Sequence, residues 1–142
     1  MDVDKLLHAL NNDENLNIID LDFKTIAKEK NDVLQKLQLD KDYLKQLHKS
    51  LKMYRYVDTV DALHYGAYVR WITLTDPEHI QLRNGGIICE MKVIQDSIHI
   101  KVKNNLNRIF QFNMNEVFVF QKLNPQEQVI LKAMKLIGGG AP

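Results

Sequence analysis

Histidine and cysteine are the side chains in this sequence most able to bind a metal or attack a substrate. The five histidines fall in no metal-ligand spacing. His79 stands beside Asp76 and Glu78, and a polar loop tip is the simpler interpretation of that cluster. No pair of carboxylates is singled out for acid–base catalysis. We therefore predict no catalytic residue, no metal ligand and no cofactor. The histidines are His8, His48, His64, His79 and His99.

Cys89 is the only cysteine, so neither an intrachain disulfide nor a cysteine-rich zinc site can form. Its neighbours at two-residue spacing, Ile87 and Met91, are apolar. This alternation predicts a thiol that points into the core rather than a reactive nucleophile. A reducing compartment fits this cysteine content.

Aromatic side chains in the second half of the chain are the first candidates for a binding surface. In the segment YVRWI, Tyr68 and Arg70 face one side of an expected strand and Trp71 faces the other. Such rings can stack on bases or enclose a methylated cation. The alternative is that they only fill the core. Further rings expected at the same end are Tyr65, Phe110, Phe118 and Phe120.

Basic side chains accompany these rings and are expected to share one exposed face. With a nearby ring, that face could follow a phosphate backbone. The same lysines could equally protect the edges of a sheet from pairing with other chains. The basic residues of this face are Lys92, His99, Lys101, Lys103 and Arg108. The candidate binding surface combines them with Tyr68, Arg70 and Trp71.

A second basic feature is a stripe along one expected helix. Regularly spaced ammonium groups can neutralise successive phosphates, which favours nucleic-acid binding. A solvated helix face is the more common meaning of such a stripe. It consists of Lys41, Lys45, Lys49 and Lys52.

Composition limits the classes of protein that these candidates can belong to. The chain has 142 residues, 45% of them hydrophobic, which is enough for one ordinary domain with a core. Its net charge of +1 argues against a dedicated duplex-binding protein. The acidic and polar N-terminal sequence predicts neither a signal peptide nor a membrane-spanning stretch. We expect an intracellular protein that is not secreted and does not bind a membrane.

The elements that position these residues change character along the chain. Helical spacing predicts an N-terminal helical region over residues 1–60, including a helix from about Asp40, its N-cap, to Arg55 with Tyr54 on the apolar side. Asn124, followed by Pro125 and by Glu127 three residues after the cap, predicts a C-terminal helix over 124–137. Residues 138–142 are expected to be a disordered tail.

Two-residue alternation predicts five short antiparallel strands over residues 61–123. A long first connection and tighter later ones indicate a closed SH3-like or Tudor-like barrel. Closing a small barrel requires one strongly bent strand, and glycine permits the positive φ or close backbone approach that this demands. Gly85 and Gly86 are expected to provide it, and Gly66 precedes the first strand. The fold class predicted is therefore α+β.

The segments YRYVDTVDALHYGAYVRWITL, LRNGGIICEMKV and RIFQFNMNEVFVFQKL resemble small proteins of nucleocytoplasmic large DNA viruses, the giant viruses. In that pattern a Gly-x-aromatic-aliphatic-Arg-aromatic-Ile strand precedes a Gly-Gly strand and an aromatic-rich last strand. The resemblance implies a virus-encoded component of the virion or the viral factory, with no catalytic residues to carry over. The matching positions, within residues 54–123, are Gly66, Tyr68, Val69, Arg70, Trp71, Ile72, Gly85, Gly86, Phe118 and Phe120.

Two classes of function follow from these observations. The preferred one is a non-enzymatic adaptor or minor structural protein of the virion that binds another protein, viral or host. We prefer it because the residues singled out above belong to expected binding surfaces, and none of them belongs to a reactive site. The alternative is a nucleic-acid-binding accessory factor that uses the basic face and the lysine stripe. A small enzyme is a distant third class, which would gain support if Arg70, His79 and a carboxylate lined the same pocket. The expected location is the host cytoplasm, the viral factory or the virion.

Overall fold

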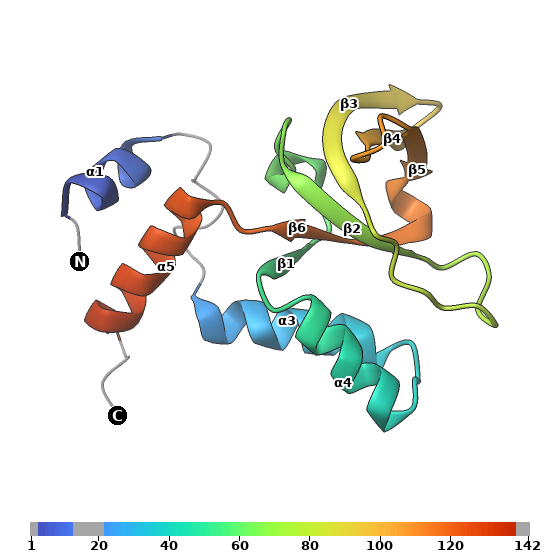
Figure 1. The fold of residues 1–142 in the computed structure, drawn as a ribbon, viewed down its shortest axis with the longest axis horizontal. Helices are drawn as coiled ribbons and strands as arrows, with labels where there is room; N and C mark the ends of the chain where they lie inside the picture. The colour runs from blue at the N-terminus through green and yellow to red at the C-terminus, as the bar shows by residue number, and fades with distance from the viewer. Residues whose placement is uncertain (1–2, 13–21, 139–142) are drawn as a thin grey trace.

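The computed structural model describes residues 3–12 and 22–138. Within these ranges the chain is an α+β protein in which helices precede and follow an antiparallel sheet (Figure 1). The α+β class, the N-terminal helices and the C-terminal helix are thereby confirmed. The helices are α1 (Val3–Asn11), α3 (Phe23–Gln35), α4 (Lys41–Ser50) and α5 (Pro125–Gly138). The strands are β1 (Tyr54–Val57), β2 (Tyr68–Thr73), β3 (Gly86–Ile94), β4 (Ser97–Lys103), β5 (Ile109–Asn113) and β6 (Val117–Lys122). Of the expected tail, residues 139–142 lie outside the described ranges.

Helix α4 has the predicted N-cap but ends earlier than the expected helix over 40–55. The Asp40 carboxylate accepts a hydrogen bond from the Tyr43 N–H at 2.9 Å. The helix ends immediately before Leu51, whose carbonyl oxygen accepts a hydrogen bond from the Lys30 ammonium at 2.8 Å. The same carbonyl accepts from the Tyr54 N–H at 3.0 Å, so a side chain from α3 adds a second hydrogen bond at the helix end.

The sheet has six strands in the order β1-β6-β2-β3-β4-β5, and all neighbouring pairs are antiparallel. We expected a closed barrel of five strands, whereas this sheet is open, with β1 and β5 at its edges. The additional strand is β1, in which Tyr54 lies opposite Lys122 of β6 instead of on a helix face. Pairing with a distant strand overrides the helical spacing of that segment, which local sequence cannot reveal.

Strand β3 carries an irregularity that changes which of its residues face the core. Its pairing with β4 shifts between Ile88 and Glu90, so that Cys89 is the extra residue of a bulge. Ile88 is buried, Ile87 is exposed, and the thiol of exposed Cys89 lies 3.4 Å from the carbonyl oxygen of Lys101. The prediction of an inward-facing Cys89 is wrong, because a shift of one residue exchanges the two faces of a strand.

The glycine pair before β3 allows two close backbone approaches. Gly85 has φ +91°, and a Cβ there would collide with the carbonyl oxygen of Val69. A Cβ on Gly86 would lie 2.6 Å from the carbonyl oxygen of Lys103. Neither position therefore leaves room for a side chain. The irregularity that bends β3 lies beyond them, at Cys89.

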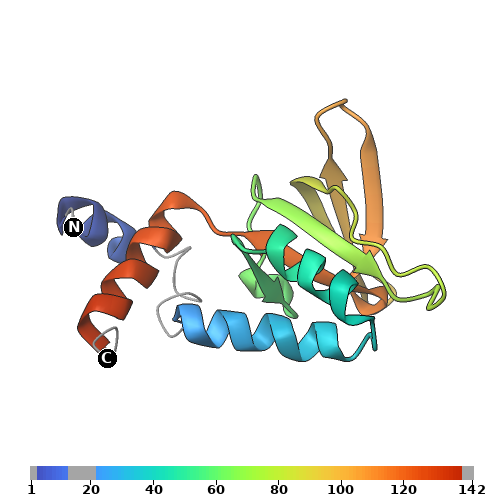
Figure 2. The ribbon, with the colours of Figure 1, turned by 60° about the horizontal axis from the view of Figure 1, so that its bottom comes forward.

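The two faces of the sheet pack against different partners. Helices α3 and α4 cover one face, where they bury Phe120 and Ile72 (Figure 2). The other face curls around its own apolar core, which includes Trp71. The expected convergence of the aromatic rings is therefore wrong. Phe118 and Phe120 lie beside Tyr56 on the helix-covered face, Phe110 lies beside Trp71 on the other, and Tyr65 is 63% exposed.

Helix α5 leaves the sheet at the end of β6 and packs on α1 (Figure 1). It begins with the predicted capping box. The Asn124 side chain accepts from the Glu127 N–H at 2.8 Å, and the Glu127 carboxylate accepts from the Asn124 N–H at 3.0 Å. None of the helices in the described ranges is long and apolar enough to cross a membrane.

Candidate ligand-binding groove

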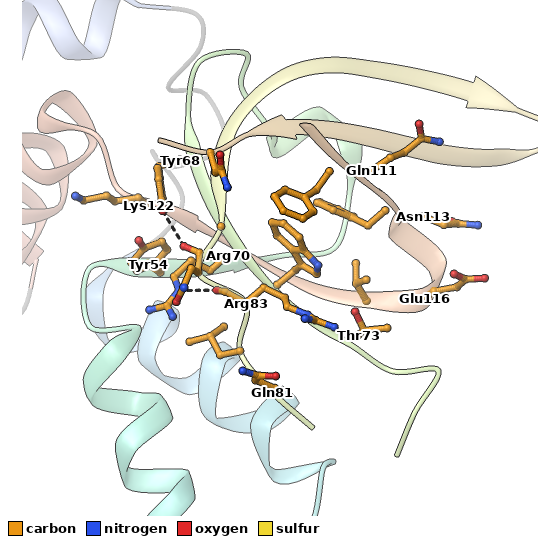
Figure 3. Close-up of a pocket in the computed structure, with 18 of the residues that line it drawn as sticks. Tyr54, Tyr68, Arg70, Thr73, Gln81, Arg83, Gln111, Asn113, Glu116 and Lys122 are labelled. Carbon is orange, nitrogen blue, oxygen red and sulfur yellow. Dashed lines mark hydrogen bonds between the residues drawn. The ribbon is translucent and has the colours of Figure 1, made fainter. Parts of the chain in front are cut away.

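A groove of about 1350 Å³ opens between strand β5 and the loop that leads into β3 (Figure 3). Residues 110–113 of β5 line one wall and residues 81–85 of the loop line the other. Trp71 and Thr73 of β2 contribute the floor, and Tyr54 and Lys122 lie at one end. The groove therefore occupies the side on which the sheet fails to close.

Three aromatic rings form an apolar surface inside this groove. The ring centroids of Trp71 and Phe112 are 4.8 Å apart, and each of these residues is 7% exposed. Phe110 lies 6.5 Å from Trp71 by the same measure and is 44% exposed. A buried pair thus supports one accessible ring, against which an apolar side chain of a ligand can pack. Trp71 is the only tryptophan of the chain, so its fluorescence reports on this site.

The backbone of β5 presents unpaired groups along the groove. At the turn between β4 and β5, the Asn104 N–H donates to the Arg108 carbonyl at 2.9 Å. Antiparallel strands exchange hydrogen bonds at every second residue pair. Counted from the hydrogen-bonded pair Asn104–Arg108, the next such pairs contain Phe110 and Phe112, which therefore direct their N–H and C=O groups toward β4. The residues that direct these groups away from β4 are Ile109, Gln111 and Asn113. No other strand of the described ranges lies on that side.

Hydrogen bonds hold the opposite wall in place before any ligand binds. The Tyr68 hydroxyl donates to the Asn84 carbonyl at 2.7 Å, and Arg70 Nε donates to the Arg83 carbonyl at 2.8 Å. The Arg83 N–H donates in turn to the Trp71 carbonyl at 2.8 Å. A wall fixed in this way needs little ordering when a ligand enters, which favours binding.

Positive charge dominates the loop side of the groove. Lys122, Arg70 and Arg83 follow one another along this side (Figure 3), and none of them forms an ion pair with a carboxylate of the described ranges. Glu116 is the acidic residue among the lining side chains. Tyr54 lies close to this row: burial raises the pKa of its hydroxyl, and the Arg70 charge acts in the opposite direction.

The groove brings together four residues of the predicted binding surface and leaves out the rest. Tyr68, Arg70, Trp71 and His99 line it. Lys92 and Lys101 lie on the outer face of β3 and β4, where both ammonium groups bind the carboxylate of Glu90, at 2.9 and 3.2 Å. Lys103 and Arg108 are exposed and line no part of the groove.

Three members of the predicted lysine stripe lie on α4, whereas the fourth, Lys52, follows the end of that helix. The stripe is separate from the groove. Its members, Lys41, Lys45, Lys49 and Lys52, are all exposed, opposite the buried Leu47. The predicted structural glycine Gly66 has φ +82° and open space around it.

Several groove residues were missed by sequence reasoning. Phe112 and Gln111 lie in a predicted strand, but only its position at the sheet edge makes them wall residues. Arg83 lies in a loop whose sequence has no hydrophobic periodicity, so no local signal indicates where its side chain points. Two-residue spacing along the last strand places Lys122 on the same face as Phe120, which the helices cover, so spacing alone does not indicate that Lys122 lines the groove.

Arg70 lines the groove, whereas His79 does not. His79 lies outside the groove, in an exposed loop, with its Nδ1 2.9 Å from the Asp76 carboxylate. Within residues 3–12 and 22–138, no group of three or more His, Cys, Asp and Glu side chains is placed to hold a metal ion. The condition that would favour an enzyme, a pocket joining Arg70, His79 and a carboxylate, is not met here.

Comparison with known proteins adds no identification to this geometry. No protein family, no curated protein and no solved structure matches the chain.

Proposed function

We propose that this protein is a non-enzymatic interaction module that binds an extended segment of another protein in the groove. The segment adds to the sheet as a further strand beside β5. The observation that carries this proposal is the unpaired edge of β5, which lies along a groove with an aromatic floor and a fixed opposite wall. In β-strand addition, main-chain hydrogen bonds supply affinity and pockets for alternate side chains supply specificity.

We also propose that strands β2 to β6 are an SH3-like barrel, opened along this groove. Three features support this assignment: the order β6-β2-β3-β4-β5, the long connection between β2 and β3, and the 3₁₀ helix η3 (Met114–Glu116) before the last strand. Strand β1 extends the sheet on the other side of β6. A bound strand would occupy the gap that separates this arrangement from a closed barrel.

A peptide selection followed by two readouts tests the proposal. Displayed random peptides of about eight residues are long enough to pair with all of β5 at about 3.3 Å per residue. Selected peptides are expected to change the fluorescence of Trp71. Hydrogen exchange at the N–H groups of Ile109, Gln111 and Asn113 should slow on binding. Exchange at Phe110 and Phe112, whose N–H groups already point toward β4, should change much less.

A pair of variants at Gln111 separates strand addition from other modes of binding. Gln111→Pro removes an N–H that points away from β4, so β5 keeps its ladder to β4 while losing a donor to the ligand. Gln111→Ala is the control, because it removes the same side chain and keeps the donor. Peptide affinity should fall about tenfold or more for the proline variant relative to the alanine variant. Equal affinities, or the absence of any selected peptide, would refute the proposal.

Nucleic-acid binding is the alternative, and the charge arrangement favours it less. Two lysines of the expected basic face are engaged by Glu90. The helix stripe, although exposed, is separate from the aromatic groove. A salt titration with single-stranded and duplex DNA tests this alternative, since binding through phosphates weakens steeply with salt. Loss of that binding in a variant with Lys45, Lys49 and Lys52 changed to Gln would favour the nucleic-acid function.

The viral part of the proposal rests on the sequence resemblance alone. It assigns the module to a giant virus, as an adaptor or minor structural protein of the virion or the viral factory. Quantitative mass spectrometry of purified particles and of infected-cell fractions tests this assignment. Absence of the protein from both the particles and the factory fraction would contradict it.

A further inference from the structure

We infer that the segment bound in the groove is acidic, with a carboxylate side chain that lies against Arg70 and Arg83. This inference rests on the proposed binding of an extended segment and specifies its chemistry. It follows from the guanidinium groups along the loop wall, which the described residues leave without a carboxylate partner.

Arg70 is positioned to bind a carboxylate before the ligand arrives. Its Nε is occupied by the Arg83 carbonyl at 2.8 Å, which fixes the plane of the guanidinium and leaves the terminal nitrogens for a ligand. Tyr54 lies close enough for the Arg70 charge to affect the pKa of its hydroxyl. A carboxylate at this place would meet a planar donor group and a neighbouring hydroxyl.

Arg83 and Lys122 extend the positive row on either side of Arg70 (Figure 3). The Arg83 side chain is exposed. The hydrogen bonds by which Arg83 helps to hold the loop come from its backbone and do not involve its guanidinium. Glu116 lines the other part of the groove and would repel a second acidic residue there. The charges therefore favour an acidic residue near the Arg70 end and a neutral or basic residue near Glu116.

An acidic peptide fits this site better than a nucleic acid does. The three cations line the same groove as an unpaired strand edge, which supplies the alternating donors and acceptors that a peptide backbone matches. A phosphate backbone has no such donors. The amide side chains along the walls, among them Gln81, Asn84 and Gln111, suit the polar groups of a peptide equally well.

The experiment compares matched peptides and matched variants by the fluorescence of Trp71. Selected peptides of the proposed-function experiment are made in two forms, with each Asp or Glu kept or replaced by Asn or Gln. Each form is titrated into the native protein, Arg83→Gln and Arg108→Gln at about 0.05 M and about 0.2 M NaCl. Arg108 is the control, because it is an exposed arginine outside the groove.

The acidic form is expected to bind about tenfold more tightly than the amide form. Arg83→Gln should weaken the acidic form about three- to fivefold and leave the amide form unchanged, whereas Arg108→Gln should change neither. Equal binding of the two forms would overturn the acidic specificity while leaving strand addition in place. Failure of every peptide to bind would overturn both. A single-stranded oligonucleotide that displaces the peptide and binds at least as tightly, with loss in Arg83→Gln, would overturn the inference in favour of nucleic acid.

Discussion

The guanidinium of Arg55 and the carboxylate of Glu127 form an ion pair inside the protein. Arg55 Nε lies 3.8 Å from Glu127 Oε2, and the two side chains are 6% and 2% exposed. Burial lowers the pKa of Arg55, and the negative charge of Glu127 opposes that shift. Arg55 also donates to the Ala62 carbonyl at 3.3 Å. The pair joins strand β1 to helix α5, so it ties the unexpected strand to the C-terminal helix.

Removing the charge of Glu127 should destabilise the fold strongly. In Glu127→Gln the side chain can still accept a hydrogen bond from the Asn124 N–H, but buried Arg55 loses its ion-pair partner and keeps only the weaker effect of the Glu29 charge. We expect a loss of about 3 kcal/mol in the free energy of unfolding, measured by urea denaturation. Glu116→Gln, at an exposed carboxylate, is the control and should stay within about 0.5 kcal/mol of the native protein. Similar losses in the two variants would show that the ion pair contributes nothing specific.

Alanine at Gly85 should cost more than alanine at Gly66. Both residues have positive φ, so both substitutions introduce backbone strain of about 1 kcal/mol or more. At Gly66 the added Cβ meets open space, whereas at Gly85 it collides with the Val69 carbonyl. Urea denaturation of both variants measures the difference. Equal losses would mean that the loop shifts away from β2 without cost.

Two phenylalanines of β5 should separate binding from stability. Phe112 is buried against Trp71, so Phe112→Ala is expected to cost about 3–5 kcal/mol of unfolding free energy. Phe110 is largely accessible in the groove, so Phe110→Ala should cost less than about 1.5 kcal/mol and still abolish most peptide affinity. Denaturation and peptide titration are run on the same samples. Full peptide affinity in Phe110→Ala would show that the Phe110 ring does not contribute to binding.

His48 should make the protein less stable in mild acid. Burial lowers its pKa from the ordinary 6.5, and the Lys30 charge lowers it further. Between the folded pKa and 6.5 the unfolded chain binds more protons at this residue, so its contribution to stability increases with pH through that window and is lost as pH falls. His48→Gln should flatten this part of the stability curve, measured by urea denaturation between about pH 5 and 7. An unchanged slope in the variant would contradict this assignment.

Local signals in the sequence predicted the elements that depend on neighbouring residues. The Asp40 cap and the Asn124–Glu127 capping box are contained within four residues each, and both form as expected. Two-residue alternation located strands β2 to β6, because a side chain's face depends on the backbone conformation of its own strand. Four residues of the predicted binding surface, Tyr68, Arg70, Trp71 and His99, line the groove.

Long-range pairing decided the rest. The local pattern predicts Tyr54 in a helix, but in the structure Tyr54 pairs with β6. The local pattern also predicts Cys89 in the core, but the register shift against β4 places Cys89 on the exposed face. The groove exists because β5 remains an edge while residues 81–85 are held against β2, and its walls come from segments far apart in the sequence. Sequence patterns report the backbone state of nearby residues. Which strand lies beside which is set by the packing of the whole chain, and that packing placed Arg83 and Lys122 beside Arg70.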